Sequence, residues 1–264
     1  MPRPFHSIYT HGFVRAAVCV PPVRVAEPAF NAAQTIALAQ RAHNEQAVVA
    51  LFPEMGISSY AIDDLFHQDA LLEATVTGVA AVVEASRELT PVLLVGAPLR
   101  FEGGLYNCGV VIYRGRVLGL APKSYLPNYR EFYEKRQFVS ARHAHFREVR
   151  FLGQTVPFGN DLIFTAYNLP GFGLHVEICT GPTAISPHSR ATAPSVASLL
   201  WKMTCVQPSP CCPFSNLHSP NFSFPSNAFS NGNPTSCAAG RPNGSRSSSP
   251  SSCATGPSWT RKSG

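Results

Sequence analysis

Three residues with complementary chemistry each stand close behind a predicted β-strand in this sequence: Glu54, Lys123 and Cys179. In open α/β sheets, ligands bind beyond the carboxyl ends of the strands, so the topology alone can bring these side chains to one edge. A thiolate can attack an amide carbonyl, a carboxylate can take the thiol proton, and an ammonium can stabilise the oxyanion. The three residue types therefore indicate acyl transfer from an amide.

Each of these residues also has a purely structural interpretation. A cysteine at a strand end is often an ordinary core residue. Charged residues at strand ends are mostly solvated surface groups. Position alone leaves both interpretations open for Glu54, Lys123 and Cys179.

The apolar pattern predicts the elements that position these residues. Helices are predicted where apolar residues recur at helical spacing, over residues 29–45 and 70–89. Strands are predicted at short apolar runs, namely 13–20, 47–52, 92–97, 107–113, 117–121, 161–167 and 172–178. Pro98 is expected to end its strand, and Arg114-Gly115-Arg116 to turn a hairpin. The order βαβαβ followed by hairpins predicts an α/β protein with a mixed sheet, whose two helices pack together on one face.

The composition changes at Cys179. All 15 acidic residues lie at or before Glu177, where 15 basic residues balance them, so the net charge of +6 comes from six basic residues after Cys179. That region is rich in serine and proline and has no apolar period, so it buries too little surface to offset its ordering entropy. The sequence therefore predicts a domain over residues 1–179 and a disordered tail over residues 180–264.

Several classes of protein are excluded by these patterns. The basic residues of the tail are scattered and form no patch, so nucleic acid is not an expected partner. No run of about 18 apolar residues could span a membrane, and no secretory signal precedes the domain, so a cytoplasmic protein is expected. The tail cysteines lack the paired spacing of zinc ligands, so no metal is expected.

Three segments resemble the catalytic blocks of the carbon–nitrogen hydrolase (nitrilase) superfamily: residues 51–60, 122–136 and 173–179. The second of these, beginning Pro-Lys-Ser-Tyr-Leu-Pro-Asn-Tyr-Arg-Glu-Phe, is similar to the N-terminal glutaminase domain of the glutamine-dependent NAD synthetase family. The resemblance covers residues 10–179. It implies the nitrilase-type αββα sandwich, incomplete in this chain.

The resemblance also implies roles for individual residues. Cys179 is the nucleophile that forms a thioester with glutamine, Glu54 the proton acceptor and Lys123 the oxyanion donor. Tyr129 and Tyr60 are expected to contact the substrate. Glu131 matches a second glutamate that orients the catalytic lysine.

The same resemblance implies what the domain works with. The released ammonia would serve the amidation of deamido-NAD. The glutaminase domain needs no cofactor, whereas ATP and Mg²⁺ belong to a synthetase half whose pattern is missing from this sequence. Family members are homo-oligomers.

The sequence departs from the family pattern directly after the expected nucleophile. The family continues with Glu-Asp and an aromatic residue, whereas this chain has Thr180-Gly181-Pro182. With the change in composition, this indicates a chain frameshifted or cut short after Cys179, with little activity expected. Two alternatives stay open, which are a stand-alone nitrilase-type amidase acting on another small amide and an inactive truncated product.

Overall fold

The structure is a computed structural model that describes residues 7–11, 13–166, 172–178, 196–201 and 259–261. Its internal contacts divide the chain into two units, one of Met1–Met203 with Thr255–Gly264 and one of Thr204–Ala254. The second unit lies wholly outside the described residues. All elements below belong to the first unit.

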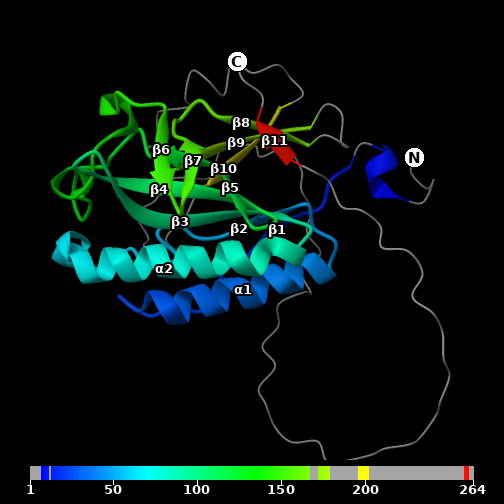
Figure 1. Cartoon of the computed structure of the whole chain (residues 1–264), viewed down its shortest axis with the longest axis horizontal. Coiled ribbons are helices and arrows are strands. Elements are labelled where there is room, and N and C mark those ends of the chain that lie inside the picture. Colours follow the sequence, from blue (N-terminus) through cyan, green and yellow to red (C-terminus); the bar gives the residue numbers. More distant parts are fainter. Residues whose placement is uncertain (1–6, 12, 167–171, 179–195, 202–258, 262–264) are drawn as a thin grey trace, which may run out of the picture. The chain divides into compact units, whose positions relative to one another are not determined.

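A five-stranded mixed sheet forms the centre of this unit (Figure 1). Its strands lie in chain order: β1 (Ala16–Val18), β2 (Val49–Leu51), β3 (Val92–Phe101), β4 (Gly104–Tyr113) and β5 (Arg116–Pro122). The strands β1, β2 and β3 run parallel, and β3, β4 and β5 are joined as antiparallel hairpins. The prediction that the strands at 47–52 and 92–97 are neighbours in the centre of the sheet is confirmed.

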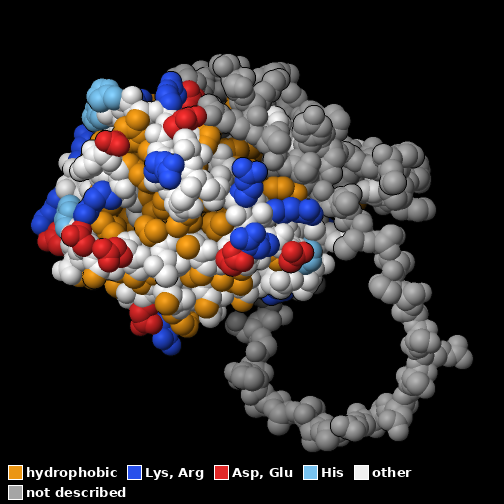
Figure 2. All heavy atoms as spheres, viewed as in Figure 1, with side chains coloured by type: hydrophobic (Ala, Val, Ile, Leu, Met, Phe, Trp, Pro, Cys, Tyr) orange, Lys and Arg blue, Asp and Glu red, His pale blue; other side chains and the backbone are white. Residues whose placement is uncertain are grey.

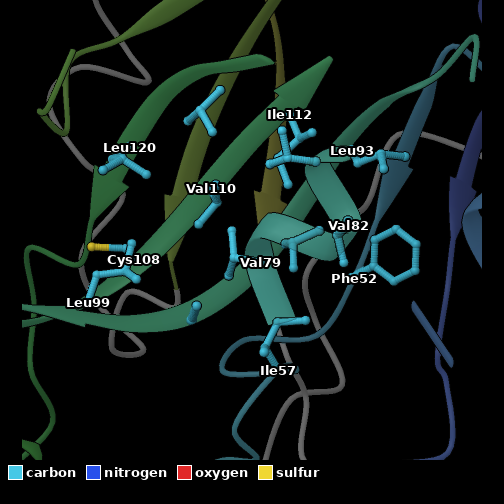
Figure 3. Packing of buried hydrophobic residues seen from close by; sticks show 14 of the residues in the cluster. Phe52, Ile57, Val79, Val82, Leu93, Leu99, Cys108, Val110, Ile112 and Leu120 are labelled. Carbon is cyan, nitrogen blue, oxygen red and sulfur yellow. The ribbon is translucent and has the colours of Figure 1, made fainter. Parts of the chain in front are cut away.

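Two helices, α1 (Pro28–Asn44) and α2 (Asp69–Ala85), pack against each other and cover one face of this sheet (Figure 1). Proline is favoured at the first position of a helix, where Pro28 stands, because the missing N–H would have no partner there. A Cβ on Gly78 would lie 3.2 Å from the Pro28 carbonyl oxygen, so this glycine lets the helices approach closely. Val79 and Val82 of α2 pack on Leu93, Val110 and Ile112 of the sheet (Figure 3).

A second sheet packs on the opposite face, with its strands in the order β10-β9-β8-β11. The bounds of these strands are Ile163–Ala166 for β8, Gly173–Ile178 for β9, Val196–Trp201 for β10 and Trp259–Arg261 for β11. Leu94 and Val111 of the first sheet share a core with Phe164, Leu174 and Val176 of the second. The described residues thus supply three layers, one of helices and two of sheet, as expected of an incomplete αββα sandwich.

Strands β10 and β11 lie in the region 180–264, for which the sequence predicts no regular structure. Strand β10 runs parallel to β9, and β11 pairs antiparallel with β8. The rest of that region lies outside the described residues, so its disorder stays a prediction.

The expectation that Pro98 ends its strand is wrong, because β3 continues to Phe101 and pairs Pro98 with Asn107 of β4. The pairing of β2 with β3 ends at Leu94. Past that point β3 has no neighbouring strand on the β2 side among the described residues. A proline without an N–H on that side removes no hydrogen bond between strands. Such edge positions are where proline is tolerated in a sheet.

A second difference is the hairpin of β6 (Glu148–Phe151) and β7 (Gln154–Pro157), which the sequence pattern did not predict. The predicted hairpin at Arg114-Gly115 is confirmed, with positive φ at both residues (46° and 75°). Short 3-10 helices complete the described elements: η1 (Ile8–His11), η2 (Asp63–His67), η3 (Ser86–Glu88), η4 (Glu134–Arg136) and η5 (Ala141–His143).

The surface of the described part carries both signs of charge. On the face shown in Figure 2, Lys and Arg side chains lie interspersed with those of Asp and Glu. No helix within the described ranges has the length and apolar content needed to cross a membrane.

Candidate active site

Glu54 is brought to the site by the loop that follows β2. The loop is fixed to β3 by backbone hydrogen bonds from the Phe52 N–H to the Leu94 carbonyl (3.0 Å) and from the Ile57 N–H to the Gly96 carbonyl (3.2 Å). A Cβ on Gly96 would lie only 2.4 Å from the Met55 nitrogen. Glycine at this position therefore lets the Glu54 loop lie directly on the sheet, and the carboxylate is buried there.

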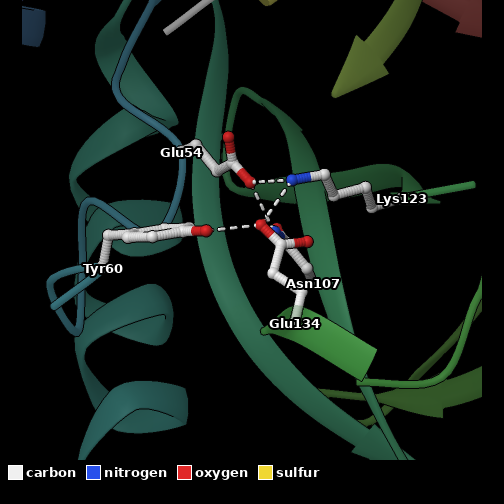
Figure 4. A network of polar contacts seen from close by, with 5 residues as sticks. All are labelled: Glu54, Tyr60, Asn107, Lys123 and Glu134. Carbon is white, nitrogen blue, oxygen red and sulfur yellow. Dashed lines mark hydrogen bonds and ion pairs between the residues drawn. The ribbon is translucent and has the colours of Figure 1, made fainter. Parts of the chain in front are cut away.

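Lys123 follows the last residue of β5 and is 2% exposed. Its N–H donates to the Asn107 carbonyl at 2.8 Å, which continues the pairing of β5 with β4. Its Nζ lies 2.8 Å from Oε1 of Glu54 and 2.7 Å from Oε1 of Glu134 (Figure 4). The ammonium is therefore held between two buried carboxylates.

The environment keeps Lys123 protonated. Burial lowers the pKa of the Lys123 ammonium, but the neighbouring Glu54 and Glu134 carboxylates more than offset this, so its pKa lies above the ordinary value. The pKa of Glu134 is also raised, mainly because the side chain is buried, although Lys123 and the Tyr60 hydroxyl act in the opposite direction. A lysine held in this way acts as a cation and not as a general base.

Two neutral side chains complete the polar network. The Tyr60 hydroxyl donates to Oε1 of Glu134 at 2.6 Å, and Nδ2 of Asn107 donates to Oε1 of Glu54 at 2.6 Å (Figure 4). Both carboxylates thus accept one hydrogen bond from Lys123 and one from an uncharged donor. Hydrogen bonds to ionised groups are about twice as strong as neutral ones, so this network is strongly held.

The lysine-orienting contact predicted for Glu131 is made by Glu134 instead. Glu131 is exposed, whereas Glu134 is 3% exposed and begins the 3-10 helix η4, which turns its side chain toward Lys123. The two glutamates stand three residues apart in the same segment, so spacing from Lys123 does not distinguish them. Asn107 was also missed, although a polar residue within an apolar strand is a signal that the sequence offers.

Tyr60 and Tyr129, which are expected to contact the substrate, lie in the same region as Glu131. Tyr60 and Glu131 line a cavity of about 130 Å³, together with Phe132, Glu134 and Gln137 among others. Tyr129 is 50% exposed and does not line this cavity, but its ring meets the edge of Phe132 with the centroids 5.8 Å apart.

Cys179, the predicted nucleophile, lies outside the described residues. The strand that leads to it, β9, ends at Ile178. Ile178 lines a small cavity of about 20 Å³ with Pro122 and Ser124, which are the two neighbours of Lys123 in the chain. The described part of the chain therefore leads to the edge of the site where Lys123 stands.

Within the residues described here, no group of three His, Cys, Asp or Glu side chains could hold a metal ion. The described part of the site is a cluster of two carboxylates, one ammonium and two neutral hydrogen-bond donors.

Comparison with known proteins identifies the family of this chain. Residues 15–183 match the family model described as carbon–nitrogen hydrolase. The curated relatives include the glutamine-dependent NAD(+) synthetases of Mycobacterium tuberculosis and Mycobacterium leprae, which are 46% and 45% identical over 200 residues. Each match covers 76% of this chain and 29% of the relative, so the chain spans less than a third of the length of these proteins.

A solved structure shows the same fold. The crystal structure of a glutamine-dependent NAD(+) synthetase from Cytophaga hutchinsonii superimposes with a TM-score of 0.56 at 23% sequence identity. The match covers 63% of this chain and 28% of that protein.

Proposed function

Because the chain belongs to the carbon–nitrogen hydrolase family, we propose that it hydrolyses the side-chain amide of glutamine through a thioester on Cys179. The observation that carries this proposal is the buried Lys123 ammonium between Glu54 and Glu134, at the edge of the site to which β9 leads. A cation fixed before the substrate arrives can stabilise a developing oxyanion without reorganising.

In the first half of the reaction, Cys179 Sγ attacks the carboxamide carbon while its proton passes to Glu54. The electron pair of the C=O bond moves to oxygen, and Lys123 Nζ donates a hydrogen bond to this oxyanion. When the intermediate collapses, the C–N bond breaks and nitrogen takes the proton from Glu54. Ammonia leaves, and the glutamyl group remains on Cys179 as a thioester.

In the second half, a water molecule gives a proton to Glu54 and attacks the thioester carbonyl. Lys123 stabilises the second oxyanion in the same way as the first. The C–S bond then breaks, the proton on Glu54 returns to the sulfur, and glutamate is released. Glu54 acts alternately as base and acid, while Lys123 keeps its charge throughout.

The cavity beside the network supports glutamine as the amide. Glu134 Oε2 and Gln137 Nε2 are buried polar atoms without a hydrogen-bond partner among the described residues, and both residues line this cavity. A buried acceptor and a buried donor without partners are costly, and a bound amide that reached them would remove this cost. Glu131 lines the same cavity and supplies a carboxylate for the α-ammonium of glutamine. Tyr60 lines this cavity and would contact the same ligand there, and Tyr129, whose ring meets the cavity residue Phe132, would contact it from outside.

The ammonia would be used for the amidation of deamido-NAD. The mycobacterial relatives named glutamine-dependent NAD(+) synthetase support this assignment. In this proposal the glutaminase reaction itself needs no cofactor. ATP and Mg²⁺ would act in a synthetase domain that residues 15–183 do not include.

Ammonia release by the purified 264-residue chain tests this proposal. Glutamine, asparagine, acetamide and propionamide are offered at equal concentrations, with the Cys179→Ala variant as the control. Because the family pattern is interrupted after Cys179, we expect release from glutamine to be slow, and the variant should abolish it. Release that survives in the variant would exclude the thioester. A preference for the simple amides would favour a stand-alone amidase instead.

A further inference from the structure

Asn107 is a buried side chain, 1% exposed, that the catalytic proposal above does not use. Its neighbours Tyr106 and Cys108 point into the core beneath the helices, and Asn107 lies on the opposite face of β4. Its carbonyl accepts the N–H of Lys123 at 2.8 Å, so strand pairing fixes the two residues side by side. The pairing of β4 with β5 therefore places Asn107 at the site.

The contact between Asn107 and Glu54 has only one chemically sound orientation. An ionised carboxylate only accepts hydrogen bonds, so the amide nitrogen of Asn107 must face it. Nδ2 lies 2.6 Å from Oε1 of Glu54, and Oδ1 is buried without a partner in the described part of the chain. The asparagine is thus placed for its donor and not for its acceptor.

Both donors to Glu54 meet at the same oxygen. Lys123 Nζ lies 2.8 Å from Oε1, which also accepts from Asn107. Figure 4 shows the other oxygen of the Glu54 carboxylate pointing away from both donors. Two converging donors fix the plane of the carboxylate and occupy the lone pairs of Oε1.

From this geometry we propose that Asn107 is a positioning residue, which holds the Glu54 carboxylate so that Oε2 takes the proton of the nucleophile. The inference rests on the proposed function, because it needs Cys179 as the source of that proton. Lys123 alone binds one carboxylate oxygen but allows rotation about the contact. Asn107 supplies the second contact that removes this rotation.

The loss of Asn107 has a defined effect on the reaction. The charged groups that face Glu54 among the described residues are Lys123 and Glu134, with Tyr60 bound to Glu134. Without Asn107, Lys123 is the one hydrogen-bond donor left to the Glu54 carboxylate among the described residues, so the carboxylate can turn away from the nucleophile. Losing a hydrogen bond to an ionised group corresponds to about a 10- to 100-fold change in rate.

The test compares two variants of Asn107 with a matched control on the same strand. Asn107→Leu keeps the volume and removes the donor. Asn107→Asp offers a donor only while its new carboxyl group is protonated. Cys108→Ala disturbs the packing of the next residue of β4 without touching Glu54, and thermal unfolding shows that each variant is folded.

We expect kcat of Asn107→Leu to fall about 10- to 100-fold while KM for glutamine changes little. Asn107→Asp should regain activity relative to the unmodified chain as the pH is lowered, because its protonated carboxyl group can donate to Glu54. Cys108→Ala keeps the kcat and the pH profile of the unmodified chain. A kcat of Asn107→Leu that matches Cys108→Ala would overturn the proposal.

A second readout does not depend on the substrate. The rate at which iodoacetamide alkylates Cys179 is followed on the tryptic peptide 151–190, which contains no other cysteine. We expect slower alkylation in Asn107→Leu and no change in Cys108→Ala. If alkylation slows but no amide releases ammonia, the role of Asn107 stands and the proposed function falls. If ammonia is released from glutamine but Asn107→Leu changes neither kcat nor the alkylation rate, the proposed function stands and the role of Asn107 falls.

Discussion

Replacing Gly96 by alanine tests whether the close approach of the Glu54 loop to β3 is needed for activity. The added Cβ would lie 2.4 Å from the Met55 nitrogen and 2.6 Å from the Pro53 carbonyl oxygen. Ordinary contact begins at 3.4 Å, so the backbone on one side must move by about 1 Å. The colliding atoms belong to backbone and not to a flexible side chain, so the loop that carries Glu54 has to shift.

Two magnitudes follow from this shift. Overpacking of this kind costs about 1–3 kcal/mol of unfolding free energy. A misplacement of about 1 Å in a catalytic group can lower the rate about 100-fold. We therefore expect Gly96→Ala to fold, to unfold at a lower temperature, and to lose about two orders of magnitude in kcat/KM for glutamine.

The matched control is Gly103→Ala in the turn between β3 and β4. Gly103 has a φ of +76° and no atom within 4 Å of the position of a Cβ, so alanine there strains the backbone by about 1–2 kcal/mol without a collision. Both variants are measured by thermal unfolding and by ammonia release. If Gly96→Ala loses stability to the same extent as Gly103→Ala and keeps full activity, the reasoning about the loop is refuted.

Three further predictions concern the polar network. The pKa of Lys123 is above its ordinary value because Glu54 and Glu134 more than offset burial. The stabilising contribution of Lys123 is therefore complete below about pH 10.4 and is lost as the pH rises through the pKa of the folded state. Above that pH, the melting temperature of the unmodified chain should fall more steeply than that of Lys123→Met. Glu134→Gln should lower the unfolding free energy in urea by about 1–3 kcal/mol, whereas Glu131→Gln changes it by less than about 0.5 kcal/mol; equal effects would contradict the assignment of Glu134. Tyr60→Phe should cost about 1–2 kcal/mol by the same measurement, because it removes the hydroxyl that donates to Glu134, and no loss would show that this bond is unimportant.

The order of the elements was predictable because the apolar periods in this sequence are clear. The runs at 47–52 and 92–97 contain almost no polar residue, as expected of parallel strands buried on both faces. The hairpin β6–β7 was missed, although Val149 and Phe151 alternate with polar residues and Leu152-Gly153 forms the turn. The alternation of apolar and polar residues is present in this hairpin, but each strand has only four residues.

The site was less predictable than the fold because its contacts depend on where chain segments meet. The sequence places Glu54 and Lys123 at strand ends, and the structure brings them to 2.8 Å. Which glutamate reaches Lys123 is decided by the 3-10 turn at Glu134 and by the partner hydroxyl of Tyr60, 74 residues away. No local pattern encodes a meeting at that separation.

The polar network has a consequence for the order in which the protein is made. All its members, from Glu54 to Glu134, precede Cys179 in the chain. At about 5–20 residues per second, the ribosome needs roughly 2 to 9 seconds to pass from Glu134 to Cys179. The segments that carry the buried ammonium and its carboxylates are therefore synthesised seconds before the thiol.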